Sequence, residues 1–447
     1  MGAFTTFVIA AALSQAAPAE PRRTSVDELV RAALQGSGLV EEAEGKVDEW
    51  RGRLSEVQSI FYPKLSGMGF VAPMFRVRGA FPLEQDVTRD YTDWGPYVQL
   101  QALLVQPLTT FGRAAAGWNA AEHRMQVERA RAQQTRNVLA LEVRKFYYLH
   151  LYARSLLPAL ENGQKTLEKA RVAAEELYES NSGKVTQVDL QKLAYGSAEL
   201  EKYLLQAQVG AALSLEALKH MAAMPAEAPL VLVDDALPSP DGAPLPSLPA
   251  ALRMASERRP EWLQVHHGKK AALSNEQAER LANLPTLFAA GRFEAAWTPM
   301  REDARNSYVF DPFNRVTGGV AVGLQFDVDP WKARAKGDAA HGLLRQVEGL
   351  EKFAATGIPL EVRKAYEEAR QAEKLAEITE RSSAAARKWM LFAGTAYSSG
   401  TGDASDVLEG VVSYLQSRRS YFEALQNVHT SRATLLYATG RTGLETP

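Results

Sequence analysis

Apolar residues recur along much of the chain in alternating steps of three and four, which is the spacing of one face of a packed helix. This spacing runs through residues 43–61 and 190–218, and between them apolar positions repeat every seven residues from Trp118 to Phe146. From 112 to 178 there is no strong turn cluster, and a helix of that length would span roughly 100 Å. The pattern therefore predicts very long helices at about 110–178, 188–222, 332–396 and 405–439.

Four shorter segments follow a period of two instead, which is typical of strands. In one of them Val98, Leu100 and Ala102 alternate with Gln99 and Gln101. The predicted strands cover about 65–76, 95–106, 286–297 and 317–327, close to the 9 to 11 residues that a tilted membrane strand needs. A soluble hairpin with one buried face would give the same alternation.

The two halves of the chain repeat each other. The run Leu141-Glu142-Val143-Arg144-Lys145 recurs as Leu360-Glu361-Val362-Arg363-Lys364, and other apolar anchors keep nearly the same offset. We expect a first repeat at 20–224, a proline-rich linker at 225–249 and a second repeat at 250–447. The predicted fold class is therefore mainly α, with a strand hairpin and long coiled-coil helices in each repeat.

The N-terminal residues resemble an export signal. An apolar run from Phe4 to Leu13 precedes Ala17-Pro18-Ala19, a small-residue cleavage pattern, although the usual basic residue before the run is missing. We interpret 1–19 as a cleaved signal peptide. No other stretch reaches the roughly 18 to 20 apolar residues of a membrane helix, so contact with a bilayer would use the strands.

Composition narrows the class of function further. With 51 basic and 53 acidic residues the formal charge is −2, which gives no electrostatic support for a nucleic-acid partner. Cysteine is absent, and we find no phosphate-binding loop, nucleophile elbow or metal-binding motif. The pair His266-His267 is interpreted as a helix-face feature. The sequence therefore predicts no enzyme activity, no cofactor and no metal.

Four strands are too few to close a membrane barrel. An open sheet in lipid would leave the backbone groups of its edges unsatisfied. Two subunits would give eight strands and a barrel filled by side chains, whereas three would give twelve and leave room for a pore. We therefore expect a homotrimer with a twelve-stranded barrel in lipid.

The order of these elements resembles that of the TolC-like outer-membrane factor family over essentially the whole mature chain. The sharpest local match is Tyr397-Ser398-Ser399-Gly400 followed by Asp406-Val407-Leu408-Glu409. The resemblance implies an outer-membrane barrel continuous with an α-helical barrel in the periplasm. It also implies a periplasmic adaptor protein and an inner-membrane transporter as partners in tripartite efflux or type I secretion.

The same resemblance implies roles for six residues. Asp406 and Glu409 would form the channel aperture, and Tyr397 and Asp189 would form a hydrogen-bonded gating tie between neighbouring coiled coils. Gly183 and Gly400, which precede the predicted helices at 188–222 and 405–439, would form the tip turns.

The chain departs from the family pattern at two tip positions. Gly402 stands where the family can carry a basic residue, and Glu409 replaces an aspartate. A simpler alternative is that Asp189 and Asp406 only stabilise the first turns of their helices. The alternative function is a periplasmic coiled-coil adaptor or scaffold without a barrel.

Overall fold

The computed structural model describes residues 23–79, 87–180, 185–240, 244–303, 308 and 310–444. The predicted signal peptide at 1–19 therefore lies outside the described residues. Two compact units form, and both are discontinuous in sequence. Unit 1 comprises Met1–Glu42, Ala132–Pro260 and Thr356–Pro447, and unit 2 comprises Ala43–Arg131 and Glu261–Ala355.

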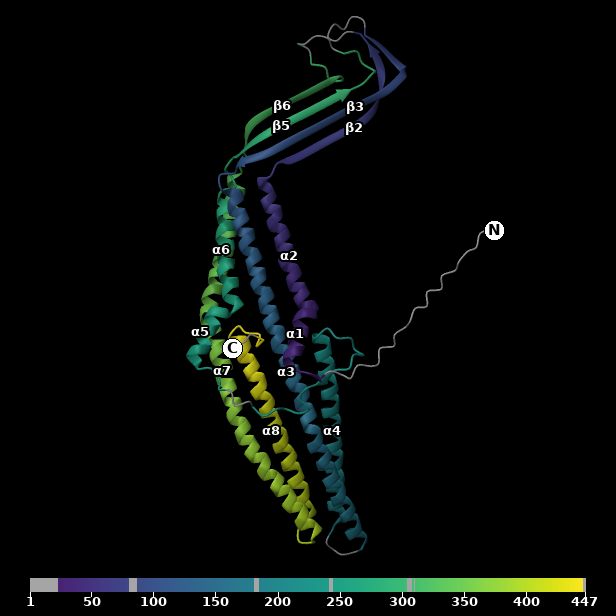
Figure 1. Ribbon diagram of the computed structural model, residues 1–447, viewed down its shortest axis with the longest axis vertical. Helices are drawn as coiled ribbons and strands as arrows, with labels where there is room; N and C mark the ends of the chain where they lie inside the picture. Colours follow the sequence, from purple (N-terminus) through teal and green to yellow (C-terminus); the bar gives the residue numbers. More distant parts are fainter. Residues whose placement is uncertain are drawn as a thin grey trace, which may run out of the picture. The chain divides into compact units, whose positions relative to one another are not determined.

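Helices dominate the chain, which confirms the mainly α-helical prediction (Figure 1). In the first half they are α1 (Val26–Gly36), α2 (Gly38–Gln58), the short η1 (Ser59–Phe61), α3 (Arg113–Glu179) and α4 (Gln187–Met221). In the second half they are α5 (Leu248–Arg258), α6 (Pro260–Arg280), α7 (Pro330–Ser398) and α8 (Ala404–Ala438). In the described part of the chain, none of these helices combines the length and the apolar character of a membrane span.

The helix starts follow local capping chemistry. Ser25 caps α1 in a reciprocal capping box with Glu28, and Thr186 caps α4 in the same way with Asp189. These boxes satisfy backbone N–H groups that have no partner inside the first turn. The long helices α3 and α7 contain 67 and 69 residues, with Pro158 and Pro359 inside them.

The larger hydrophobic core lies in unit 1, where α1, α3, α4 and α8 pack together. The proline-rich segment belongs to this core, because Leu230, Leu232 and Leu237 are buried in it. Within that segment β4 (Val231–Leu232) pairs in parallel with β1 (Arg23–Thr24). The segment 225–249, predicted as a proline-rich linker or equatorial segment, therefore contributes side chains to the core of unit 1.

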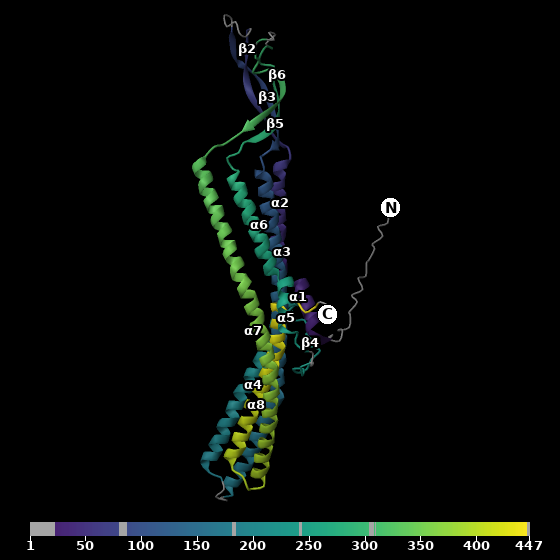
Figure 2. The ribbon, with the colours of Figure 1, turned by 90° about the vertical axis from the view of Figure 1, so that its left-hand side faces the viewer.

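A second core lies where α4 and α8 run beside the later parts of α3 and α7, which both ribbon views show side by side (Figures 1 and 2). Two glycines let the helices approach closely. A Cβ at Gly196 of α4 would lie 2.6 Å from Leu408 Cδ1 of α8, and one at Gly163 of α3 would lie 3.1 Å from Leu415 Cδ1. Each leucine therefore occupies the space that a glycine leaves open.

Unit 2 contains a four-stranded antiparallel sheet in the order β2-β3-β5-β6 (Figure 1). The strands are β2 (Lys64–Arg78), β3 (Thr88–Thr109), β5 (Thr286–Trp297) and β6 (Arg315–Gln325). The hairpin strands β2 and β3 extend beyond the predicted segments 65–76 and 95–106. A bulge between Phe75 and Arg76 shifts their register and lets the pairing continue to Arg78 and Thr88.

The register separates the sheet into two chemically different faces. Leu65, Leu104, Gly291 and Val320 are successive partners across the four strands and share one face. That face carries only apolar side chains and glycines over alternate positions of 65–75, 94–104, 291–297 and 316–322. The opposite face carries polar groups, among them Gln99, Gln101, Arg292, Glu294, Arg315 and Thr317.

Candidate functional site

The turn between α7 and α8 is closed by backbone hydrogen bonds around Gly400. This glycine has φ of +76° and donates its N–H to the carbonyl of Tyr397 at 2.9 Å. Gly402 then donates its N–H to the carbonyl of Ala396 at 3.0 Å. A Cβ at Gly402 would lie 3.0 Å from both Ala396 Cβ and Tyr397 N, so this turn has little space for a side chain. A side chain at 402 would therefore require these neighbours to shift by a few tenths of an ångström.

The turn that precedes α4 lies partly outside the described residues, and Gly183 is among the residues not described. The structure does describe the helix start itself. The carboxylate of Asp189 accepts hydrogen bonds from Thr186 Oγ1 at 2.6 Å and from the Thr186 N–H at 3.0 Å. These bonds from Thr186 lower the pKa of Asp189. Asp189 therefore serves as the second member of a capping box.

Tyr397 packs into the second core of unit 1, where its side chain is only 8% exposed. Its hydroxyl has no hydrogen-bond partner among the described residues. Burial raises the pKa of Tyr397, and the negative charge of Asp189 raises it further. The structure thus brings the two predicted tie residues into electrostatic range but does not join them by a hydrogen bond.

The two predicted aperture carboxylates lie on one exposed side of α8. Asp406 is in the first turn and Glu409 follows three residues later, so their side chains share a face. Between them in sequence, Val407 is buried in the second core, as is Val411 one turn further on. The apolar side of this helix end faces the core and leaves both carboxylates in solvent.

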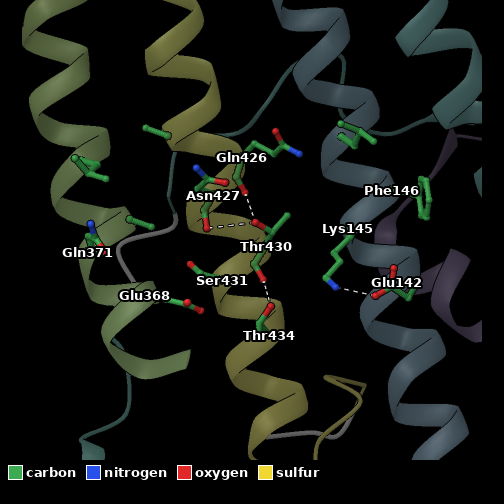
Figure 3. A pocket seen from close by; sticks show the side chains of 14 residues that line it. Glu142, Lys145, Phe146, Glu368, Gln371, Gln426, Asn427, Thr430, Ser431 and Thr434 are labelled. Atoms are coloured by element: carbon green, nitrogen blue, oxygen red, sulfur yellow. Dashed lines mark hydrogen bonds and ion pairs between the residues drawn. The ribbon is translucent and has the colours of Figure 1, made fainter. Parts of the chain in front are cut away.

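A cavity of about 600 Å³ with a mixed polar and apolar lining lies between α3, α7 and α8 within unit 1 (Figure 3). Its α8 wall carries Gln426, Asn427, Thr430, Ser431 and Thr434. The α3 wall carries an ion pair between Lys145 Nζ and Glu142 Oε1 at 2.7 Å. Sequence reasoning missed this cavity, although polar residues repeating at helical spacing along 426–434 could have indicated it.

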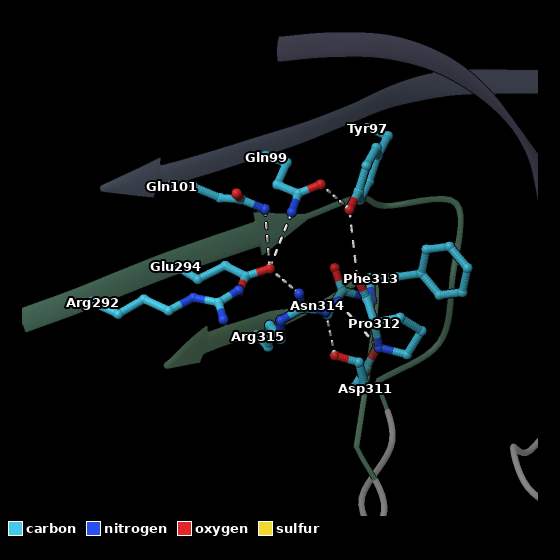
Figure 4. Close-up of polar contacts among 10 residues, drawn as sticks. All are labelled: Tyr97, Gln99, Gln101, Arg292, Glu294, Asp311, Pro312, Phe313, Asn314 and Arg315. Carbon is cyan, nitrogen blue, oxygen red and sulfur yellow. Dashed lines mark hydrogen bonds and ion pairs between the residues drawn. The ribbon is translucent and has the colours of Figure 1, made fainter. Parts of the chain in front are cut away.

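A charged cluster occupies the polar face of the sheet in unit 2 (Figure 4). Glu294 Oε1 accepts hydrogen bonds from Gln99 Nε2 at 3.0 Å and from Arg315 Nη2, and Glu294 Oε2 accepts from Arg292 Nη2 at 2.7 Å. A further bond from Gln101 Nε2 to Oε1 measures 3.5 Å. The pairs Arg292/Glu294 and Gln99/Gln101 each stand two residues apart on one strand, but only the cross-strand register brings all of these groups together.

Within the described residues, no group of three or more acidic, histidine or cysteine side chains is placed to hold a metal ion. His123 of α3 and His267 of α6 lie side by side, with their Nδ1 atoms 3.2 Å apart. Burial lowers the pKa of both imidazoles. Two neutral imidazoles at this distance can share one N–H···N hydrogen bond.

Long helical hairpins in one unit and a sheet with one apolar face in the other define the architecture of an outer-membrane channel. The family model for outer membrane efflux proteins matches residues 29–222 and 251–441. The chain belongs to this family. The predicted resemblance is thereby confirmed, and the two matched stretches fall in the two halves of the chain.

Solved outer-membrane channels share the fold at low sequence identity. The channel OprN superposes with a TM-score of 0.75 at 16% identity, over 93% of this chain and 89% of OprN. VceC from Vibrio cholerae gives 0.73 at 15% identity, over 93% and 96%. CmeC from Campylobacter jejuni gives 0.73 at 14% identity, over 93% and 85%. A comparison with curated protein sequences gave no significant match.

Family membership fixes the general role of the protein. It is an efflux-type channel of the outer membrane that extends into the periplasm. Members of this family are passive channels rather than enzymes, which confirms the prediction that the chain is not an enzyme. The alternative of an adaptor or scaffold without a membrane portion is not supported.

Proposed function

We propose that three copies of the chain form a passive trans-periplasmic duct, the outer-membrane component of a tripartite efflux or type I secretion system. An inner-membrane transporter and a periplasmic adaptor protein deliver small molecules or proteins to it. The duct itself catalyses no reaction, so its structure needs only a continuous wall, a water-filled lumen and a means of closing.

The observation that carries this proposal is the division of the sheet into two faces. On the apolar face Val320 is 92% exposed, and Leu65, Val71 and Val322 are exposed as well. Burying each such side chain in hydrocarbon is worth about 1.5–3 kcal/mol. A contiguous apolar face of this extent in water would be an aggregation hazard, whereas in lipid it is the normal outer surface of a barrel.

The edges of the sheet favour assembly with further copies. In the described sheet β2 and β6 each have a neighbour on one side only. Every unsatisfied backbone group at such an edge costs several kcal/mol in a bilayer. Pairing β2 of one subunit with β6 of the next satisfies both edges, and three subunits give a closed barrel of twelve strands with room for a lumen.

The proposed aperture consists of Asp406 and Glu409 from each subunit. Both carboxylates are exposed, and neither is committed to the core of its own chain. In a trimer six carboxylates would surround one axis, where they would attract cations strongly. Asp406 can also stabilise the first turn of α8 through the helix dipole, which is compatible with its position. The carboxylate stays charged in that role, so it can still attract cations at the aperture.

The proposed gating tie joins Tyr397 and Asp189 in the closed state. The support for it is the buried hydroxyl of Tyr397, which lacks a partner among the described residues and lies in the field of Asp189. A buried hydroxyl without a hydrogen bond is unfavourable by about 1–3 kcal/mol, so a small shift that brings a partner within reach would be stabilising. The tip turns at Gly183 and Gly400 would allow that shift.

The proposed organisation also includes a signal peptide at 1–19 and two repeats, 20–224 and 250–447, joined through 225–249. Each repeat supplies one strand hairpin to the barrel and one long helical hairpin to the tunnel. Because the two repeats are equivalent, three chains would build a wall of six similar units.

The proposal is tested with the full-length protein extracted from outer membranes in detergent. We expect a species of three subunits that migrates as a trimer without heating, dissociates on boiling, and forms ion-conducting pores in planar bilayers. A protein found only as a soluble monomer in the periplasmic fraction would overturn the proposal.

A further inference from the structure

A pair of histidines connects two helices of unit 2 that come from different halves of the chain. His123 belongs to α3 and His267 to α6, 144 residues apart in sequence, and their Nδ1 atoms meet at 3.2 Å. The ring centroids are 5.3 Å apart, and the ring planes are tilted by 39°. Both imidazoles are only partly buried, so solvent can reach the pair.

Helix packing next to the pair holds α6 against both of its neighbours. Gly268, which follows His267, has a helix on each side. A Cβ at Gly268 would lie 3.6 Å from Val347 Cγ1 of α7 and 4.0 Å from Val127 Cγ2 of α3. Val127 is only 3% exposed, so this contact is part of the packed interior of the unit. The two histidines are therefore carried by packed helices, which are more precise supports for a binding site than loops.

The separation of the two nitrogen atoms suits a metal ion held between them. An imidazole nitrogen binds Zn²⁺ at about 2.0–2.1 Å, so a tetrahedral ion with two such ligands holds their nitrogen atoms about 3.3 Å apart. The observed separation of 3.2 Å corresponds to an angle of about 103° at the ion. An ion can therefore take the place of the shared hydrogen without separating the two helices.

The proton balance and the nearby charges permit this exchange at neutral pH. Two neutral imidazoles carry one N–H each, so both Nδ1 lone pairs become free once the donating ring holds its hydrogen on Nε2. Burial lowers the pKa of both histidines, which keeps the rings neutral at pH 7. The charged groups that act on both rings, Glu122 and Lys270, have opposite signs. Lys269 on the same helix is paired with Glu351 at 2.7 Å.

We propose that His123 and His267 form a two-histidine binding site for a divalent transition-metal ion, Zn²⁺, Ni²⁺ or Cu²⁺. Imidazole suits these ions, whereas the hard ions Mg²⁺ and Ca²⁺ prefer oxygen ligands. In the part of the chain that the structure describes, no third acidic, histidine or cysteine side chain joins the pair in a metal-binding group, so water completes the coordination.

A bound ion would fasten the two halves of the chain to each other within unit 2, because α3 comes from the first half and α6 from the second. The sequence predicted no metal, since the pair His266-His267 has no further ligand at a metal-binding spacing. Only the packing of α3 on α6 supplies the second imidazole.

The first test is calorimetric titration of the full-length protein with ZnCl₂ at neutral pH, in detergent and without a polyhistidine tag. We expect one ion per chain. His123→Gln and His267→Gln should each weaken binding by at least about tenfold, because the loss of even an outer partner of a metal ligand commonly has an effect of that size. His341→Gln is the matched control, since it removes another histidine of unit 2, whose Nδ1 lies 3.3 Å from Glu276 Oε1. This variant should bind Zn²⁺ as the wild type does.

Two further measurements do not depend on small differences in affinity. The electron paramagnetic resonance spectrum of the wild-type protein with one Cu²⁺ per chain should show coupling to two imidazole nitrogens. Zn²⁺ should also raise the denaturation midpoint of the wild-type protein but leave that of His123→Gln unchanged, because an ion that binds only the folded state stabilises it. Mg²⁺ at the same concentration should have no effect on either protein.

Several results would overturn the site. Absence of Zn²⁺ binding by the wild type, or equal affinity in the wild type and both glutamine variants, would show that the pair holds no ion. Loss of binding in His341→Gln alone would place the ion beside Glu276 instead. A copper spectrum with coupling to a single nitrogen would likewise exclude the pair. None of these results depends on pore formation, so they leave the proposed duct to its own test.

Discussion

The contact between Gly196 of α4 and Leu408 of α8 offers a direct test of how the helical hairpins are held together. Alanine at 196 would place its Cβ 2.6 Å from Leu408 Cδ1 and 3.5 Å from Leu167 Cδ1. The first distance is shorter than any ordinary contact, so Leu408 must change its rotamer or α4 and α8 must move apart. Overpacking of this kind typically costs about 1–3 kcal/mol.

Gly210 on the same helix provides the matched control. A Cβ at Gly210 would meet nothing closer than Ala153 Cβ at 3.9 Å. Both substitutions gain about 0.5–1 kcal/mol from the higher helix propensity of alanine, so this gain cancels in the comparison. We expect Gly196→Ala to have a free energy of unfolding about 1–3 kcal/mol lower than that of Gly210→Ala.

The assay is guanidinium denaturation of the detergent-solubilised protein followed by circular dichroism. Leu408→Ala removes the methyl groups that collide with the new Cβ, so the double variant Gly196→Ala/Leu408→Ala should be more stable than the two single effects predict. The coupling expected for residues in contact is about 0.5–3 kcal/mol. Equal stability of Gly196→Ala and Gly210→Ala, together with zero coupling, would refute the packing argument.

Three further predictions concern the hairpin tips. Thr186→Ala should lower the free energy of unfolding by about 1 kcal/mol at pH 7 through loss of the cap. The folded-state pKa of Asp189 is lowered, so the stabilisation by this carboxylate is present above its unfolded-state pKa and is lost as the pH falls through its folded-state pKa. The stability deficit of Thr186→Ala in denaturation curves should therefore shrink below about pH 4. Replacing Asp406 and Glu409 together by Ala should weaken block by multivalent cations in single-channel recordings, and unchanged block would disprove the charged aperture. Tyr397→Phe should raise the resting conductance, since the proposed tie needs the hydroxyl; a resting conductance equal to wild type would argue against the tie.

The helices and strands of this fold are encoded by local patterns that a single sequence displays. The segment predicted at 286–297 is observed as β5, Thr286–Trp297, because turn-forming residues bound a clear period-two run. The full length of the hairpin strands β2 and β3 could not be predicted from the pattern, because the outer part of the hairpin alternates poorly and depends on a bulge near Phe75. The strand pair β1–β4 has only two residues in each strand, and its pairing joins positions about 200 residues apart. No local pattern reports such a pair.

The candidate sites show the same division between local and long-range information. The turn at Gly400 could be predicted, since a glycine with positive φ after a helix is a local feature. The Glu294 cluster could not, because Gln99 and Arg315 come to Glu294 only through the registers of three strands. The cavity lined by α3, α7 and α8 likewise depends on helix packing between distant segments.

The unlike edges of the sheet have a genetic consequence for the proposed ring. Because β2 of each subunit pairs with β6 of the next subunit, every junction in the ring is head-to-tail. A chain whose β6 cannot pair because of a mutation still has an intact β2 that can pair with a neighbouring subunit. Such a chain would enter mixed rings and leave each of them with a gap. Co-expressed at equal levels with the wild type, it would leave roughly one ring in eight intact by random assembly, so edge mutations in this gene should be dominant negative.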